Sequence, residues 1–185
     1  MDLVGVDEAG RGALAGDMHM GACKLFVDMT DLKDSKKLSE KKRAILYEKI
    51  IQNSNFLILA FSPFQIDQLG LSKCLQLGLK IIKMHFNDSE ILYDGNLNYG
   101  VDGIKTMIKA DAKIQAVSAA SILAKFSRDQ KMKFLSQIYP EYGFDKHKGY
   151  GTNFHLEKIK IYNHTPIHRK SFIVKKFEKT LFDLS

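Results

Sequence analysis

Four acidic residues stand at positions where buried strands are predicted to end. They are Asp7, Glu8, Asp94 and Asp111. In open α/β sheets, functional groups gather beyond the carboxyl ends of the strands, so these carboxylates converge if their strands are neighbours. Converging carboxylates repel one another unless a cation lies between them, and all-oxygen ligand sets favour Mg²⁺ or Mn²⁺. The pattern predicts a metal site for phosphodiester chemistry, of a type that serves nucleases, polymerases and integrases alike.

The pair Asp7-Glu8 sets a geometric condition. Neighbouring residues of a regular strand point to opposite faces, so the two side chains meet at one point only if the chain leaves strand geometry at Glu8. We expect it to do so, because Gly10-Arg11-Gly12 follows and its glycines allow a tight turn and a close backbone approach. A strand-end aspartate is otherwise a turn former or a helix cap, an alternative that applies least to Asp7.

The elements that must position these residues follow from the spacing of apolar side chains. Strands are predicted at Leu3–Val6, Met18–Val27, Phe56–Phe61, Glu90–Tyr93 and within Gly103–Ala110. Helices are predicted at Glu40–Gln52, Gln65–Phe86, Ile114–Gln137, Thr152–Tyr162 and Phe172–Phe182. This order predicts an α/β fold with a mixed sheet. Tyr139-Pro140 marks the expected boundary between a catalytic body, residues 1–138, and a helical C-terminal region, residues 139–185.

Length and composition favour one globular domain. The chain has 185 residues, of which 45% are apolar and 26% charged. No apolar run approaches the ~18 residues of a transmembrane helix, and no secretory signal is visible at the N-terminus. Cys23 and Cys74 lie in apolar surroundings, which indicates two buried, reduced thiols in a cytoplasmic protein.

The charge distribution favours a nucleic-acid partner. The chain carries 28 Lys and Arg against 21 acids, a net charge of +7, and basic and aromatic residues alternate toward its C-terminus. A solvated basic face is the alternative. The candidate phosphate contacts are Lys36, Lys37, Lys125, Lys148 and Arg169. Four of the six histidines also lie there, but their irregular spacing and the lack of a nearby cysteine argue against a zinc site.

Several blocks of sequence share the pattern of one enzyme family. They are Gly5–Gly16, with Asp7-Glu8-Ala9-Gly10-Arg11-Gly12; Asp34–Ser39; Tyr93–Asn96; Ala110–Lys113; Ser118–Lys125 with Arg128-Asp129; His147–Thr152; and His168–Phe172. In this order they resemble ribonuclease HII, the type 2 ribonuclease H family. The family usually has proline where Ala13 and Asp17 stand, and glycine where Ala110 stands.

The resemblance implies a ribonuclease H-like fold, a mixed five-stranded sheet flanked by helices with a helical C-terminal appendage. It implies an endoribonuclease that hydrolyses the RNA strand of RNA/DNA hybrids and nicks duplex DNA 5′ to embedded ribonucleotides, as in ribonucleotide excision repair. Two-metal-ion catalysis with Mg²⁺ or Mn²⁺ would leave 3′-hydroxyl and 5′-phosphate ends.

The same resemblance assigns roles to residues. Asp7, Glu8, Asp94 and Asp111 match the family's catalytic, metal-binding carboxylates. Gly10, Arg11 and Gly12 match the motif that reads the ribose 2′-hydroxyl, and Tyr150 matches the tyrosine at the RNA–DNA junction.

Other functions stay open at this point. One is a strand-transferring integrase or a Holliday-junction nuclease on the same fold, which would cut DNA lacking any ribonucleotide. Another is a non-catalytic hybrid-binding protein, which an intact acid quartet argues against.

We expect a monomer without a membrane partner. The apolar pair Leu181-Phe182 could dock on a replication clamp or could pack on its own domain.

Overall fold

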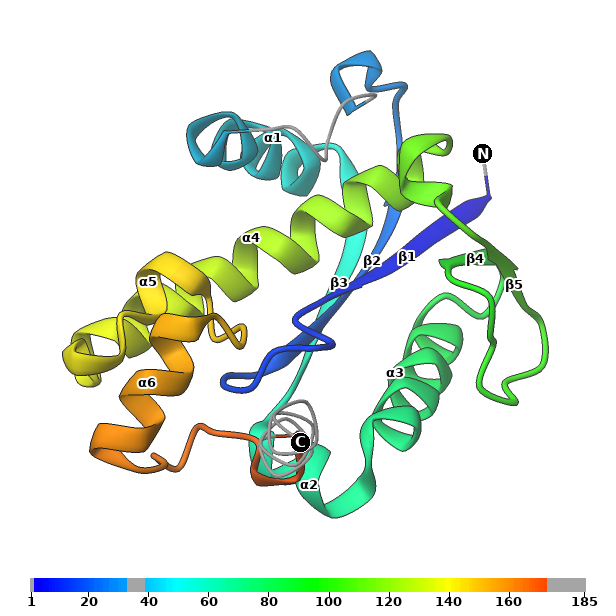
Figure 1. Ribbon diagram of the computed structural model, residues 1–185. Helices are drawn as coiled ribbons and strands as arrows, with labels where there is room; N and C mark the ends of the chain where they lie inside the picture. The colour runs from blue at the N-terminus through cyan, green and yellow to red at the C-terminus, as the bar shows by residue number, and fades with distance from the viewer. Residues whose placement is uncertain (1, 33–38, 173–185) are drawn as a thin grey trace.

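The computed structural model describes residues 2–32 and 39–172. Its centre is a five-stranded mixed sheet in the order β3-β2-β1-β4-β5 (Figure 1). The strands are β1 (Leu3–Ala9), β2 (Met18–Leu25), β3 (Ser54–Phe61), β4 (Glu90–Asp94) and β5 (Ile104–Met107). β1 pairs antiparallel with β2 and parallel with β4, and β4 pairs parallel with β5. The predicted α/β class is confirmed, and the first and fourth strands are neighbours, which was the condition for their carboxylates to converge.

Helices cover both faces of this sheet (Figure 1). The α-helices are α1 (Glu40–Gln52), α2 (Pro63–Leu69), α3 (Leu71–His85), α4 (Gln115–Ile138), α5 (Phe144–His147) and α6 (Asn153–Tyr162). Two 3₁₀ helices are η2 (Ala110–Ala112) and η3 (Pro140–Tyr142). None of the helices within the described ranges is long and apolar enough to cross a membrane.

The alternation of β1 assigns each of its residues to one of the two faces. Val4 and Val6 belong to the core that contains Leu75 and Leu79 of α3. Gly5 points the other way, toward α4, and a Cβ built on it would lie 2.1 Å from the carbonyl carbon of Ala116. The backbones of β1 and α4 are therefore nearly in contact.

Most predicted elements have bounds within two residues of those observed, and two elements differ more. The single helix expected over Gln65–Phe86 is two helices, because Gly70 between α2 and α3 has φ +80°. The first strand continues through Glu8 to Ala9, since Asp7, Glu8 and Ala9 all pair with β2. The expectation that the chain leaves strand geometry at Glu8 is therefore wrong. The helix expected at Phe172–Phe182 lies, beyond Phe172, outside the described residues.

The described part of the C-terminal region is held to the loop after β1. The amides of Leu14 and Ala15 both donate to the carbonyl oxygen of Gly149, at 2.8 and 3.2 Å, and the amide of Gly16 donates to Ile167 at 2.8 Å. The segment therefore completes the loop that follows Asp7 and Glu8. The division into residues 1–138 and 139–185 stays a prediction. Cys23 and Cys74 are buried free thiols, as expected.

Candidate active site

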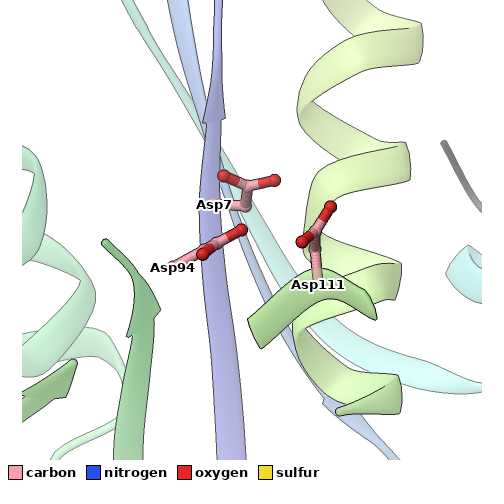
Figure 2. A group of neighbouring side chains, drawn as sticks. All are labelled: Asp7, Asp94 and Asp111. Atoms are coloured by element: carbon pink, nitrogen blue, oxygen red, sulfur yellow. The ribbon is translucent and has the colours of Figure 1, made fainter. Parts of the chain in front are cut away.

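Three carboxylates meet at the carboxyl edge of the central strands (Figure 2). Asp7 belongs to β1, Asp94 ends the neighbouring strand β4, and Asp111 lies in η2, just before α4. One carboxylate oxygen from each lies within 4.8 Å of the others. The amide of Ala110 donates to Oδ1 of Asp94 at 3.1 Å, which ties η2 to the end of β4. The convergence expected of these three residues is confirmed.

The electrostatics of this trio favour a cation. The pKa of Asp7 is raised to about 7, mainly by burial and also by the like charges of Glu8 and Asp94, against the opposing hydrogen bond from Ser121. Burial also raises the pKa of Asp94, as does its neighbour Asp111. Buried and half-buried carboxylates this close repel one another unless a positive charge lies between them. An all-oxygen donor set of this kind fits Mg²⁺ or Mn²⁺.

Glu8 lies close to the trio but on the other face of β1. Its Oε2 accepts a hydrogen bond from the hydroxyl of Tyr93 at 2.7 Å, and its Oε1 lies 3.4 Å from Nη1 of Arg11. Burial raises the pKa of Glu8, while Tyr93 and Arg11 oppose that rise. The pleat of the strand explains why Glu8 does not join the group of three.

The two glycines after β1 differ in their surroundings. Gly10 has φ +84°, and a Cβ there would lie 1.9 Å from Nε of Arg128, so neither the backbone nor the packing admits a side chain. A Cβ on Gly12 would meet nothing within 4 Å. Gly12 therefore leaves open space beside the carboxylates, into which another molecule can approach the backbone.

One cavity of about 400 Å³ joins these features. It is lined by Asp7, Glu8, Ala9, Gly10, Arg11, Gly12, Arg43, Asp94, Asp111, Ser121, Ile122, Lys125 and Tyr150. The predicted carboxylates, the glycine-arginine-glycine turn and the predicted tyrosine therefore line one cavity, although Tyr150 lies far from the others in the sequence.

Tyr150 lies at the rim of this cavity. It is 40% exposed, and the guanidinium carbon of Arg128 lies 5.4 Å from its ring centroid. Arg128 is buried and donates through Nε to the carbonyl oxygen of Asp17 and through Nη2 to that of Ala15. One arginine of α4 therefore supports both the loop after β1 and the ring of Tyr150.

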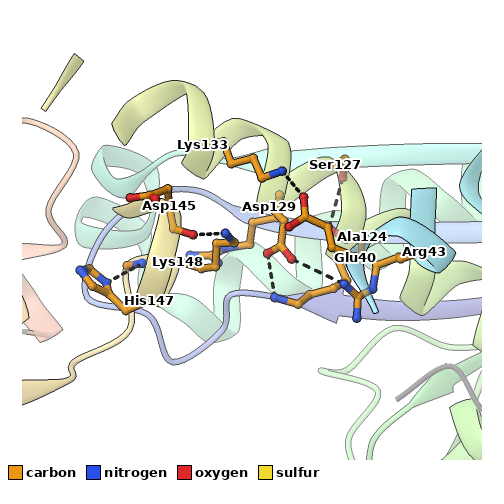
Figure 3. Close-up of polar contacts among 12 residues, drawn as sticks. Glu40, Arg43, Ala124, Ser127, Asp129, Lys133, Asp145, His147 and Lys148 are labelled. Atoms are coloured by element: carbon orange, nitrogen blue, oxygen red, sulfur yellow. Dashed lines mark hydrogen bonds and ion pairs between the residues drawn. The ribbon is translucent and has the colours of Figure 1, made fainter. Parts of the chain in front are cut away.

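The four candidate lysines fall into three groups. Lys125 lies in the cavity and pairs with Asp129 at 2.7 Å, next to the Arg43–Asp129 pair drawn in Figure 3. Lys148 donates to the carbonyl oxygen of Asp145 at a half-buried position outside the cavity lining (Figure 3). Lys36 and Lys37 lie outside the described residues.

Arg169 requires a correction. It is fully buried, and its guanidinium donates to the carbonyl oxygens of Gly16, at 2.7 and 3.0 Å, and Arg11, at 3.0 Å. A side chain in this position cannot reach a phosphate of an external duplex, so the expected phosphate contact is wrong. Arg169 instead holds the backbone of the glycine-arginine-glycine loop.

Sequence reasoning also missed residues that support the site. Tyr93 was not among the predicted site residues, and its alternation with Asp94 is the signal that places its hydroxyl on the face of Glu8. Ala110, where the resemblance led us to expect glycine, is accommodated because the left-handed conformation falls on Lys109, at φ 58°.

Comparisons with known proteins agree with this geometry. The family model described as Ribonuclease HII matches residues 4–175. The Ribonuclease HII of Campylobacter jejuni is 61% identical over 173 residues, which cover 93% of this chain and 91% of that protein. Ribonuclease H2 from Pyrococcus horikoshii has a TM-score of 0.73 at 28% identity and covers 96% of this chain and 97% of its own. The PCNA:RNase HII complex from Archaeoglobus fulgidus has a TM-score of 0.79 at 24% identity, with 92% and 93% covered.

The sheet order and the carboxylates at its edge define a protein with a ribonuclease H-like fold and a candidate metal site. Within that class, the match over nearly the whole chain is decisive. The chain belongs to the ribonuclease HII family, and it is a metal-dependent endoribonuclease with ribonuclease H activity.

Proposed function

We propose that this protein hydrolyses the RNA strand of RNA/DNA hybrids and nicks duplex DNA on the 5′ side of an embedded ribonucleotide. The products would carry 3′-hydroxyl and 5′-phosphate ends. The observation that supports this proposal best is a single cavity that contains the converging Asp7, Asp94 and Asp111 together with the open backbone of Gly12.

The carboxylates would hold the metal ions. We propose that two Mg²⁺ or Mn²⁺ ions would share Asp7 as a ligand, and that Asp94, Asp111 and, from the rim, Glu8 would complete the ligand set. Two bound cations would supply an activated water and stabilise the leaving 3′-oxygen. The hydrogen bond from Tyr93 and the ion pair with Arg11 orient Glu8 at the edge of the cavity.

The loop after β1 would recognise the ribose. Its backbone groups at Gly10, Arg11 and Gly12 can hydrogen-bond to a 2′-hydroxyl, the group that distinguishes RNA from DNA. Gly12 permits this approach because its Cβ side is empty. Tyr150, exposed at the rim, would stack on the sugar or base at the RNA–DNA junction.

Phosphate contacts and partners complete the proposal. Lys36, Lys37, Lys125 and Lys148 remain the candidates that would contact the backbone of the duplex. We propose a cytoplasmic monomer. A replication clamp is a further proposed partner, because the A. fulgidus relative was solved as a complex with PCNA. Leu181-Phe182, the pair that would contact a clamp, lies outside the described residues.

The test is cleavage of a DNA duplex that contains one ribonucleotide, labelled at the 5′ end of the strand that carries it. With Mg²⁺ or Mn²⁺ we expect one product that ends in a 3′-hydroxyl just before the ribonucleotide, which a polymerase can extend. An all-DNA duplex of the same sequence and a reaction in EDTA should stay intact. Equal cutting of the all-DNA duplex would instead indicate a structure-specific DNA nuclease, and tight hybrid binding without cleavage would indicate a binding protein.

A further inference from the structure

Two buried histidines link the Tyr150 loop to the C-terminal segment through consecutive hydrogen bonds. His155 of α6 and His168 are 0% and 2% exposed. Nδ1 of His155 lies 3.0 Å from the carbonyl oxygen of Tyr150, and the Nε2 atoms of the two rings are 3.1 Å apart. Nδ1 of His168 lies 2.9 Å from the amide nitrogen of Thr165. The chain of contacts therefore has a defined beginning and end on the backbone.

The ends of this chain fix the position of every proton. A carbonyl oxygen only accepts, so Nδ1 of His155 carries the proton that it donates to Tyr150. A backbone amide only donates, so Nδ1 of His168 is bare; it also lies 2.9 Å from Oγ1 of Thr165, a hydroxyl that can donate to the same nitrogen. Nε2 of His168 therefore carries the proton. Nε2 of His168 then donates to the bare Nε2 of His155. Both rings are neutral, and they are opposite tautomers.

The surroundings favour these neutral forms. The rings of Tyr142 and Phe144 lie 5.2 to 6.5 Å from those of the two histidines, and His147 stacks on His155 at 4.4 Å. The pKa of His155 is lowered to about 4 and that of His168 to about 3, in both cases mainly by burial. His147 contributes to both shifts, and His155 and His164 contribute to that of His168. An added proton would also place two N–H groups against each other.

The hydrogen bond from His155 acts on a residue whose side chain lies at the active site. The carbonyl oxygen of Tyr150 also accepts from the amide of Thr152 at 2.8 Å, so the backbone of Tyr150 is fixed from two directions. Its ring then extends to Arg128 and the cavity.

We infer that His155 and His168 are positioning residues, whose ordered tautomers hold the backbone of Tyr150 so that its ring meets the substrate at the junction. This inference rests on the proposed function, because it assigns Tyr150 a contact with the nucleic acid. Neither histidine touches the reacting atoms.

The first test measures the tautomers directly in the unliganded full chain. Long-range ¹H–¹⁵N correlation spectra at pH 7.5 should show His155 protonated on Nδ1 and His168 on Nε2, with the signals assigned through single-histidine variants. A His155 ring protonated on Nε2, or one that is charged, would overturn the inference, whatever the activity of the enzyme.

The second test compares two amides at position 155. In His155→Asn the amide lies near the position of Nδ1 and can still donate to Tyr150. In His155→Gln it lies near Nε2 and can contact only His168. We expect His155→Gln to lower kcat/KM for the single-ribonucleotide duplex by about five- to tenfold, as for loss of one buried hydrogen bond, and His155→Asn to lower it less than threefold. Equal losses would overturn the positioning role. His85→Gln, an exposed histidine of α3, is the matched control and should stay within twofold.

A double-mutant cycle separates this inference from the proposed function. If His155 acts through Tyr150, His155→Gln should change kcat/KM less than twofold when added to Tyr150→Ala. A full additional loss would overturn the inference while the role of Tyr150 stands. If Tyr150→Ala alone cleaves at the parental rate, the proposed junction contact fails, and the tautomer measurement still reports on the histidine chain.

Discussion

At the scale of single residues, the pleat of β1 separates two neighbouring acids. Asp7 faces α4 with Asp94 and Asp111, whereas Glu8 faces the opposite side and is held by Tyr93 and Arg11. Both carboxylates line the same cavity, but different contacts hold their side chains in place. Asp7 is fixed by the strand and by Ser121, while Glu8 depends on a tyrosine from the neighbouring strand for its orientation.

Asp7→Asn is expected to abolish cleavage and to stabilise the metal-free protein. The amide keeps the shape of the side chain but removes one of three converging negative charges. In EDTA at pH 8, the free energy of unfolding should rise on the order of 1–3 kcal/mol, as measured by urea denaturation. Activity within tenfold of the parent at saturating Mn²⁺ would contradict the bridging role. Asp88→Asn, an exposed residue of the α3–β4 loop, is the control and should leave both quantities unchanged.

Substitutions of Tyr150 should affect cleavage without affecting folding. Stacking on nucleic acid is worth ~1–3 kcal/mol per base, so Tyr150→Ala should slow single-ribonucleotide cleavage by about one to two orders of magnitude. Tyr150→Phe should lose less if stacking dominates, and nearly as much if the hydroxyl does. The melting temperature should barely change, because the ring is 40% exposed. An unfolded Tyr150→Ala protein would show that the residue is structural.

The predictability of the site also varied from residue to residue. Asp7, Asp94 and Asp111 could be placed from sequence because each follows an apolar run, and strand ends converge at one edge of a sheet. Arg169 could not be placed, because the carbonyl groups that accept its hydrogen bonds in the interior are more than 150 positions away in the sequence. No local pattern carries that information.

At the scale of elements, the packing of β1 on α4 determines where Asp7 lies. Gly5 and Gly21 both face α4, and a Cβ on Gly21 would lie 2.3 Å from the carbonyl oxygen of Ala120. Glycines on the strands and small residues on the helix bring the two backbones together. This close approach brings Ser121 of α4 within hydrogen-bonding distance of Asp7.

Two glycine-to-alanine changes should separate packing from substrate access. Gly5→Ala forces a methyl group into the backbone of α4, so it should reduce the free energy of unfolding by about 3 kcal/mol or more. Gly12→Ala meets only open space, so its stability should change by less than about 0.5 kcal/mol. Hybrid cleavage by Gly12→Ala should nevertheless fall about tenfold, ~1.4 kcal/mol of barrier, because the methyl group lies where a ribose would approach. Chemical denaturation measures the effect on stability, and initial rates measure the effect on cleavage. Unchanged cleavage by Gly12→Ala would contradict the proposal that a ribose approaches the backbone at Gly12.

The elements themselves were largely predictable, and the differences have local causes. Leu75, Leu79 and Ile82, whose helical spacing lies within the helix predicted over Gln65–Phe86, are buried on α3. The break at Gly70 was missed, because apolar spacing continues across it while a single left-handed residue redirects the chain. The length of β1 was underestimated, since pairing with β2 extends a strand over charged residues that no apolar pattern includes.

At the scale of the whole molecule, buried histidines should make stability depend on pH. The pKa of His155 is about 4 in the folded protein and about 6.5 when unfolded, so the unfolded chain binds more protons between these values. Above pH 6.5 the neutral histidine does not reduce the free energy of unfolding. As the pH falls from 6.5 toward 4 that free energy decreases, and the loss is on the order of 2 kcal/mol at pH 5. Asp7 acts with the opposite sign, because its pKa is raised to about 7.

The difference between two proteins isolates the histidine contribution. The urea midpoint in EDTA should decrease more between pH 7 and pH 5 for the parent than for His155→Asn, because only the parent has His155. Both proteins retain Asp7, so its contribution cancels in the comparison. Equal falls in the two proteins would show that His155 is not neutral when buried.

Hybrid binding should weaken steeply with salt, because the chain carries +7 and its partner is a polyanion. Each neutralised phosphate contributes ~0.9 to the slope of log K against log salt on B-form DNA. Measured with Asp7→Asn to prevent cleavage, Lys148→Ala should reduce the slope by about that amount, and Lys80→Ala on α3 should not. A salt-independent affinity would refute the electrostatic interface.

The parallel pairing of β1 with β4 has a consequence for folding kinetics. β1, β2 and β3 follow one another as antiparallel neighbours, whereas β4 joins β1 only after α1, β3, α2 and α3 have intervened. Closing the larger loop costs more chain entropy, so we expect β4 to dock late, after the transition state. Asp7 and Asp94 meet only in that step, so their repulsion is absent from the rate-limiting barrier. Relieving it should therefore slow unfolding and leave the refolding rate unchanged.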